Sequence, residues 1–201
     1  FLDSRGMETW VQSWVPCGPM LGMVIRHGEA FSISDRLTVY DESGEAIYRP
    51  TVHYAYCPAD AAIASLHELR MRDLDLQADQ RILGDEITHG RDELGCLLLG
   101  HDFGAWWIGS LLDINETREL VGGQNPTTLQ VASSVLGCVV WMIRNPDEGV
   151  NLPDDLPHEE VMEFALPYLG PFVSAPSDWR PLSDNSVNDW DDLWQFETFL
   201  V

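Results

Sequence analysis

The stretch that decides the fold is LGCLLLGHDFGAWWIGSLL, residues 94–112. Two apolar runs, Leu94–Leu99 and Ala105–Leu112, flank a segment at 100–104 that holds two glycines, a histidine and an aspartate. Apolar runs of this length around a short turn of glycine and polar residues are typical of a β-hairpin. The stretch therefore predicts two paired antiparallel strands.

Helix signals follow this hairpin directly. Asp113 and Glu116 have the spacing of a capping box, which predicts the start of a short helix. A longer helix is expected to begin with Asn125 as N-cap and Pro126 at the first helical position, with apolar residues running to Ile143. Because these residues surround nearly the whole helix, we expect it to be buried.

The chain before the hairpin is mostly strand-like. Short apolar runs separated by polar turns predict strands at 8–15, 20–25 and 51–56. The runs at 37–40 and 47–48 predict a first hairpin, and a helix is expected from Pro58 onward. A further helix is expected at 157–165, and the tryptophans near the end of the chain belong to either a docking helix or a loose tail. The fold class is thus α+β, a mixed and largely antiparallel sheet with helices.

The composition is strongly acidic. Eleven basic residues against 33 acidic ones give a formal net charge of −22, which repels phosphate backbones, so nucleic acid is not an expected partner. Acidity alone fits both a solvated surface and a cationic ligand. All the basic residues are Arg. Without Lys, no pyridoxal Schiff base or lysine imine can form within this chain.

Cysteine placement and apolar length suggest the cellular compartment. The longest nearly apolar run, 131–143, is shorter than the ~20 residues that span a bilayer, so no membrane association is expected. The four cysteines are widely spaced without a C-x-x-C pair, and Cys96 and Cys138 lie in apolar runs. We expect reduced thiols, these two buried, in a cytoplasmic protein.

Complete cofactor motifs are absent from the sequence. It contains no G-x-G-x-x-G, no P-loop, no G-x-S-x-G and no H-E-x-x-H. No metal site is expected, because His53 and Cys57 span the end of a predicted strand before a proline. What remains is a set of polar clusters inside apolar strands. Buried His and Glu side chains need a hydrogen-bond partner or a bound charge. Taken singly, each cluster is therefore explained by structural residues that are hydrogen-bonded within the protein.

Together these clusters and their surroundings carry a resemblance. The matching stretches are HGEAFSISD (27–35), YRPTVHYAY (48–56), SLHE (65–68), DELGCLLLGH (92–101), QNPTTLQVASSVLG (124–137), and PYLGP with DWRPL (167–171 and 178–182). In this order they are similar to the homospermidine synthases, bacterial members of the saccharopine-dehydrogenase-like group. The resemblance covers roughly residues 9–182, and runs of this length are far more specific than three-residue motifs.

The resemblance implies a two-part enzyme of which this chain is the carboxy-terminal portion. Residues 1–123 would form the substrate domain, 124–182 a segment that returns to pack on an NAD-binding Rossmann domain, and 183–201 an acidic tail with tryptophan. In such enzymes NAD takes a hydride from putrescine to give an imine. A second putrescine or another polyamine displaces ammonia, and the hydride is returned to give homospermidine. Putrescine and related polyamines are the implied partners, with a homodimer left open.

Three residues are the expected catalytic set. Glu29 follows Gly28, which allows a tight turn, and the run after it predicts a carboxylate that projects from a buried strand edge into the cavity. His27 and His53 have the near-neutral pKa range of a base that removes a proton from an ammonium group.

Further residues are expected around the substrate and cofactor. Diammonium substrates need carboxylates and aromatic faces, which Asp92, Glu93, Trp14 and Trp106 offer. The family is expected to have an aromatic clasp where Met20 and Leu21 stand, so the preferred polyamine stays open. At the start of the long helix, NAD contact competes with helix capping as the role of Asn125, Thr127 and Thr128.

Two other functions compete with this one. A saccharopine- or carboxyspermidine-type reductase would need Arg to hold a carboxylate, and Arg26 and Arg49 flank the motifs. A non-catalytic acidic module could instead sequester polyamines or dock a partner through its tail.

Overall fold

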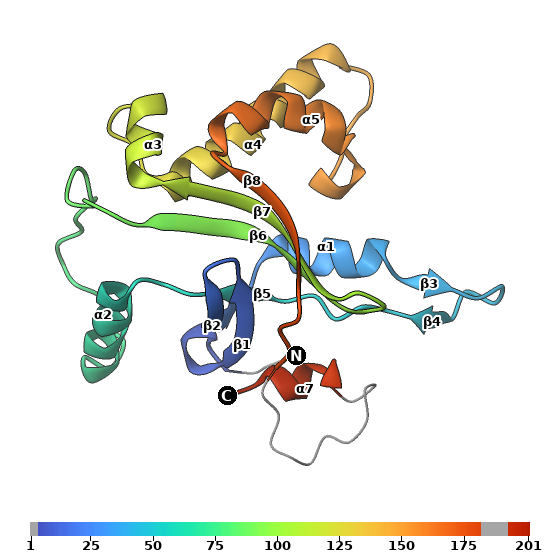
Figure 1. Ribbon diagram of the computed structural model, residues 1–201, viewed down its shortest axis with the longest axis horizontal. Coiled ribbons are helices and arrows are strands. Elements are labelled where there is room, and N and C mark those ends of the chain that lie inside the picture. The colour runs from blue at the N-terminus through green and yellow to red at the C-terminus, as the bar shows by residue number, and fades with distance from the viewer. Residues whose placement is uncertain (1–3, 182–192) are drawn as a thin grey trace. The chain divides into compact units, whose positions relative to one another are not determined.

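The computed structural model describes residues 4–181 and 193–201 and divides the chain into two compact units (Figure 1). The first unit holds the residues up to Arg81 together with those from Trp179 onward, and the second runs from Ile82 to Asp178. These units differ from the expected functional parts, 1–123, 124–182 and 183–201. The expected parts were defined by how the chain packs on an NAD-binding domain, so this division remains a prediction.

The first unit is built on a three-stranded antiparallel sheet in the order β1-β2-β5. Its strands are β1 (Trp10–Val15), β2 (Gly18–Ile25) and β5 (Tyr54–Tyr56). The turn between β1 and β2 ends at Gly18, whose φ of +134° is a conformation that other residues rarely adopt. Val11 and Met23 are buried in this unit, at 0% and 5% exposure.

Shorter elements complete the first unit. The predicted first hairpin is confirmed as β3 (Val39–Tyr40) and β4 (Ala46–Tyr48), and the predicted helix after Pro58 as α2 (Asp60–Met71). In the hairpin turn, the Asp41 carboxylate accepts hydrogen bonds from the backbone N–H groups of Ser43 and Glu45, at 2.8 and 2.9 Å. The described part of this unit also contains η1 (Gly6–Glu8) and α7 (Phe196–Phe199). The expected tail helix lies partly outside the described residues.

One expected strand is a helix. The run after Gly28 was expected to continue as an apolar strand, but it forms α1 (Gly28–Arg36), and Gly28 has no positive φ. No residue of α1 is buried. The alternation Ala30-Phe31-Ser32-Ile33 is too short to separate a strand from a helix. A tertiary contact favours the helix: the Ser34 hydroxyl donates a hydrogen bond to the carbonyl of Pro50 at 2.9 Å. This bond holds α1 against the segment that follows β4.

The second unit contains the predicted hairpin at its centre. The strands β6 (Arg91–His101), β7 (Gly104–Asp113) and β8 (Phe172–Ser177) form an antiparallel sheet in the order β6-β7-β8. Gly95 and Gly109 pair across β6 and β7, and a Cβ added to Gly95 would lie 2.5 Å from the Trp107 ring. The two glycines therefore make room for Trp107, which is 1% exposed.

Helices cover one face of this sheet (Figure 1). The predicted capping box is confirmed at α3 (Ile114–Leu120), where the Asp113 carboxylate accepts from the N–H groups of Asn115 and Glu116. The predicted long helix is α4 (Pro126–Arg144), capped by Asn125. It packs on α5 (His158–Ala165) and on the short turn η3 (Leu166–Tyr168), and another short turn, η2 (Pro153–Asp155), precedes α5 in the chain.

The expectation that α4 is buried is only half right. One face is buried, through Leu129, Gln130, Ser133 and Gly137, because it packs on the sheet and on α5. The other face leaves apolar side chains exposed, namely Val131, Val135, Leu136, Val139, Met142 and Ile143. By length and composition α4 could cross a membrane, a test that the core helices of soluble proteins also pass.

The expected burial of Cys96 is wrong. Cys96 pairs with Ile108, which is 38% exposed, on the sheet face opposite the buried Trp107, and it is itself exposed, while Cys138 is half-buried. Contact with its neighbours nevertheless raises the pKa of the Cys96 thiol by desolvation.

Candidate functional site

The first group of expected catalytic residues lies at the start of α1. His27 is the N-cap residue, and its Nδ1 makes a short contact with Oε2 of Glu29 in the first turn of the helix. A carboxylate at this end of a helix is stabilised by the helix dipole. The side chains of His27 and Glu29 are 43% and 51% exposed, so solvent or a ligand can reach them. The structure thus brings two expected residues together, on a helix rather than a strand edge.

Tyr54 joins this pair and was not foreseen. β5 pairs with β2 so that Tyr54 lies opposite Ile25, two residues before His27. The Tyr54 and His27 rings stack, with centroids 4.6 Å apart and planes inclined by 22°. The stack limits the freedom of the imidazole that contacts Glu29. The signal in the sequence was the short run Tyr54-Ala55-Tyr56, whose alternation places Tyr54 and Tyr56 on the same side of a strand.

His53 has a different environment. Its ring meets Phe196 edge-on at 5.2 Å and Phe199 at 6.1 Å. Burial lowers the pKa of His53, so the imidazole is neutral near pH 7 and retains the lone pair that a base requires. The same aromatic contacts give it a packing role in the first unit.

The remaining aromatic residues of the expected site are fixed on strands. Trp14 lies on β1 opposite Pro19 and is half-buried. Trp106 lies on β7, where its indole N–H donates to the Ser174 hydroxyl at 2.9 Å and its ring meets Phe103 at 6.4 Å. Phe103 is 77% exposed at the hairpin tip, so aromatic surface is available beside Trp106.

The carboxylates of β6 differ from each other. Glu93 has a side chain only 9% exposed and accepts from Nε and Nη2 of Arg91, at 2.7 and 2.5 Å. The adjacent Asp92 accepts from the Thr127 hydroxyl through Oδ2 at 2.5 Å. An expected substrate residue and an expected cofactor residue therefore meet, on β6 and α4.

The start of α4 shows how its polar groups are used. Oδ1 of Asn125 accepts from the backbone N–H of Thr128 at 2.9 Å, which is helix capping. Thr127 directs its hydroxyl to Asp92, as above. Capping therefore accounts for Asn125, and Thr127 is directed toward Asp92, which was expected to bind substrate. The Thr128 side chain is exposed.

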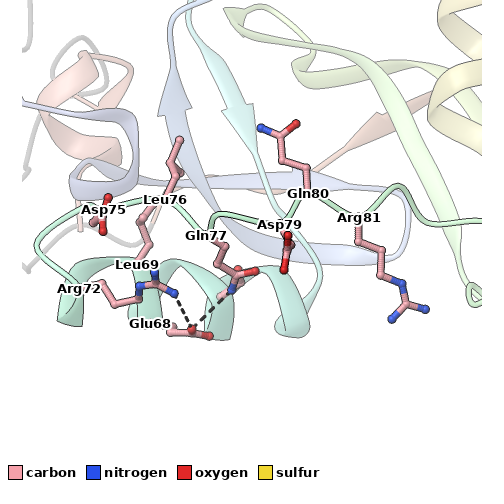
Figure 2. A pocket seen from close by; sticks show the side chains of 10 residues that line it. Glu68, Leu69, Arg72, Asp75, Leu76, Gln77, Asp79, Gln80 and Arg81 are labelled. Atoms are coloured by element: carbon pink, nitrogen blue, oxygen red, sulfur yellow. Dashed lines mark hydrogen bonds and ion pairs between the residues drawn. The ribbon is translucent and has the colours of Figure 1, made fainter.

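A separate pocket of about 290 Å³ lies in the first unit, between α2 and the segment that follows it. Figure 2 shows the Glu68 carboxylate meeting Arg72 and Gln77, at 3.7 and 3.5 Å. None of the expected site residues lines this pocket. Its Glu68 and Arg72 form an ion pair with each other, and we do not place the chemistry here. Among the described residues, no group of three or more His, Cys, Asp or Glu side chains could hold a metal ion.

Comparison with known proteins identifies relatives of this chain. No protein-family model matches the sequence. Over 208 aligned positions that include the whole chain, it is 45% identical to the homospermidine synthase of Blastochloris viridis and 40% identical to that of Mesorhizobium japonicum, spanning 43% of each. A crystal structure of the homospermidine synthase from Legionella pneumophila in complex with NAD superimposes with a TM-score of 0.92 at 37% identity, over all of this chain and 45% of that one. The chain is a relative of the homospermidine synthases.

This relationship confirms the resemblance carried by the six sequence stretches, and the α+β fold class with it. The chain spans less than half the length of these homospermidine synthases.

Proposed function

We propose that the chain is the carboxy-terminal, substrate-handling portion of an NAD-dependent homospermidine synthase. The observation that carries this proposal is identity of 40 to 45% along the whole chain to two homospermidine synthases, joined to the fold shared with a third in complex with NAD. The reaction proposed converts two putrescine molecules, or putrescine and another polyamine, to homospermidine or its analogue with release of ammonia. The setting proposed is cytoplasmic, without nucleic acid or membrane, and with a homodimer as the assembly.

The charge of the chain supports a polyamine substrate. Putrescine carries two ammonium groups, and a net charge of −22 attracts such cations to the protein surface. Selective binding needs particular carboxylates, and Glu29 and Asp92 are the two expected carboxylates that no arginine compensates in the described contacts. Glu93 already has a guanidinium partner.

The His27–Glu29 pair supports the proton chemistry. An amine must lose its ammonium proton before the neighbouring carbon can give up a hydride. With Nδ1 of His27 directed at Glu29, Nε2 is left as the nitrogen that takes this proton. The Glu29 carboxylate stabilises the imidazolium that results. The imidazole becomes neutral again when it passes this proton to the departing ammonia. Tyr54 holds the ring in place throughout.

NAD supplies the acceptor and later the donor of the hydride. The described residues could make only a few contacts with NAD, because Asn125 caps the helix and Thr127 binds Asp92. In addition, no G-x-G-x-x-G precedes a helix in this sequence. We therefore assign most of the NAD contacts to the part of the relatives that this chain does not span.

The reductase alternative has less support. Arg49 donates to Asp35 at 3.3 Å and to Thr38 at 3.0 Å, and Arg26 lies over the ring of Phe31 at 5.6 Å. Arg49 is thus occupied, which leaves it poorly placed to hold a substrate carboxylate.

The test is product analysis with the full-length protein. Purified protein containing NAD is incubated with putrescine, and the products are separated by mass spectrometry while ammonia is measured in parallel. Homospermidine and ammonia in equal amounts are expected. Absence of both, with NAD demonstrably bound, would favour the reductase or the non-catalytic module, and NADH oxidation with a carboxylated polyamine would select the reductase.

A further inference from the structure

The two neighbouring carboxylates of β6 lie in different electrostatic environments. Glu93 is almost inaccessible and accepts two N–H groups from one guanidinium, an arrangement that compensates its charge. A further cation would have to displace Arg91, which is held by two bonds at once. Glu93 is therefore committed to the protein.

Asp92 projects to the other face of the strand, because successive side chains alternate. Among the described residues its hydrogen-bond partner is the Thr127 hydroxyl, which reaches Oδ2. That bond uses one oxygen and adds no positive charge. Asp92 is half-buried, so part of the residue remains accessible to a ligand, and Oδ1 is the oxygen that Thr127 does not reach.

Thr127 is well placed to fix this carboxylate. It is the second residue of α4, next to Pro126, which is buried, and Asn125 already serves the N–H of Thr128. The Thr127 hydroxyl is thus not needed to cap the helix. A threonine on a helix end anchored in this way holds Asp92 in one orientation, and a fixed acceptor binds a cation with a smaller loss of conformational freedom.

We propose that Asp92 is the carboxylate of this pair that binds a substrate ammonium group, and that Thr127 is the positioning residue that orients it. The inference rests on the proposed function, because it takes the ligand to be a polyamine. It assigns Thr127 to the substrate rather than to NAD, and Glu93 to the structure of β6.

The test compares two variants of Thr127 in the full-length protein with NAD bound. Thr127→Val keeps the shape and removes the hydroxyl, so the KM for putrescine should rise about 10-fold while kcat changes little, as for the loss of one hydrogen bond to a charged group. Thr127→Ser restores the donor and should bring the KM back near the wild-type value. NAD retention should be the same in all three proteins. Asp92→Asn should raise the KM more than Glu93→Gln.

Calorimetric binding of putrescine to the NAD-loaded protein separates this inference from the proposed function. If putrescine binds and Asp92→Asn weakens binding, the inference holds even where no homospermidine forms. Loss of NAD from Thr127→Val with an unchanged putrescine KM would instead make Thr127 a cofactor ligand. An unchanged KM with NAD retained, failure of Thr127→Ser to restore the KM, or absence of putrescine binding to the wild type would each overturn the inference.

Discussion

Nδ1 of His27 contacts the carboxylate of Glu29 across the first turn of α1. The contact gives the histidine a defined orientation, and the stacked ring of Tyr54 reinforces it. A base oriented by a carboxylate is the arrangement that proton removal from an ammonium group requires. This pair is the part of the chain on which the proposed chemistry depends most.

Replacing Glu29 with Gln should abolish most of the activity of the full-length protein. The variant keeps the shape but removes the charge that we propose holds the ammonium and supports His27, so putrescine turnover should fall at least ~100-fold, or roughly 2.7 kcal/mol of transition-state stabilisation. NAD retention and Tm should barely change, because Glu29 is exposed and not part of the core. Turnover and thermal melting measure the two effects.

Glu42→Gln is the matched control for this variant. Glu42 is an exposed glutamate in the turn between β3 and β4, within the same unit, and its replacement should leave turnover intact. Normal turnover combined with a much lower Tm in Glu29→Gln would make Glu29 a structural residue and would remove it from the site.

His53 should make the stability of the protein depend on pH. Burial holds the pKa of His53 below its ordinary value of 6.5, so the unfolded chain binds a proton more readily than the folded one. The free energy of unfolding is then highest above the unfolded pKa and decreases as the pH falls from about 6.5 toward the lower folded pKa. Chemical denaturation at pH 7.5 and 5.5 measures this loss.

His53→Phe separates this contribution from the other titrating groups. Phenylalanine keeps the contacts with Phe196 and Phe199 but cannot be protonated. The free energy of unfolding of His53→Phe, relative to that of the wild type, should be higher at pH 5.5 than at pH 7.5. An equal difference at both pH values would show that the pKa of His53 is not lowered.

The exposed face of α4 should make the 201-residue chain bind hydrophobic dyes and self-associate. Val131 and Val135, one turn apart, are 55% and 56% exposed on this face. Replacing both with Gln should reduce dye fluorescence and sedimenting mass, with little change in Tm because neither side chain is buried. If the unmodified chain is a monomer without dye affinity, the expectation that α4 packs on a cofactor domain loses its support.

The 201-residue chain alone should not bind NAD. The glycine-rich turn that cradles the pyrophosphate is absent from its sequence, and the polar groups at the start of α4 are engaged within the chain. Isothermal calorimetry should detect no binding at micromolar NAD. Stoichiometric binding to this chain would show that it holds a cofactor site of its own.

Local signals explain which elements could be predicted. The hairpin of β6 and β7 and the starts of α3 and α4 depend on neighbouring residues: apolar runs around a glycine turn, the Asp113 capping box, and Asn125 before a proline. β8 was not foreseen. Pro176 within it cannot donate to a neighbouring strand, which obscures the strand pattern but is tolerated at the sheet edge that β8 occupies.

The candidate site could be predicted only as a set of residue types. Which carboxylate is compensated depends on Arg91 reaching Glu93, and which hydroxyl is used depends on Thr127 meeting Asp92, a residue 35 positions away in the chain. Likewise the stacking of Tyr54 on His27 follows from the register of β2 and β5, which short motifs do not encode.

The most direct test of the whole account is the fate of deuterium in putrescine. Full-length protein with bound NAD is given putrescine deuterated at both carbons that carry nitrogen, and the product is examined by mass spectrometry. In the proposed reaction NAD takes a hydride from the substrate and returns it within one cycle, so homospermidine should retain all of its deuterium, with ammonia released and no net NADH formed. Homospermidine that has lost deuterium, or accumulation of reduced cofactor without homospermidine, would contradict it.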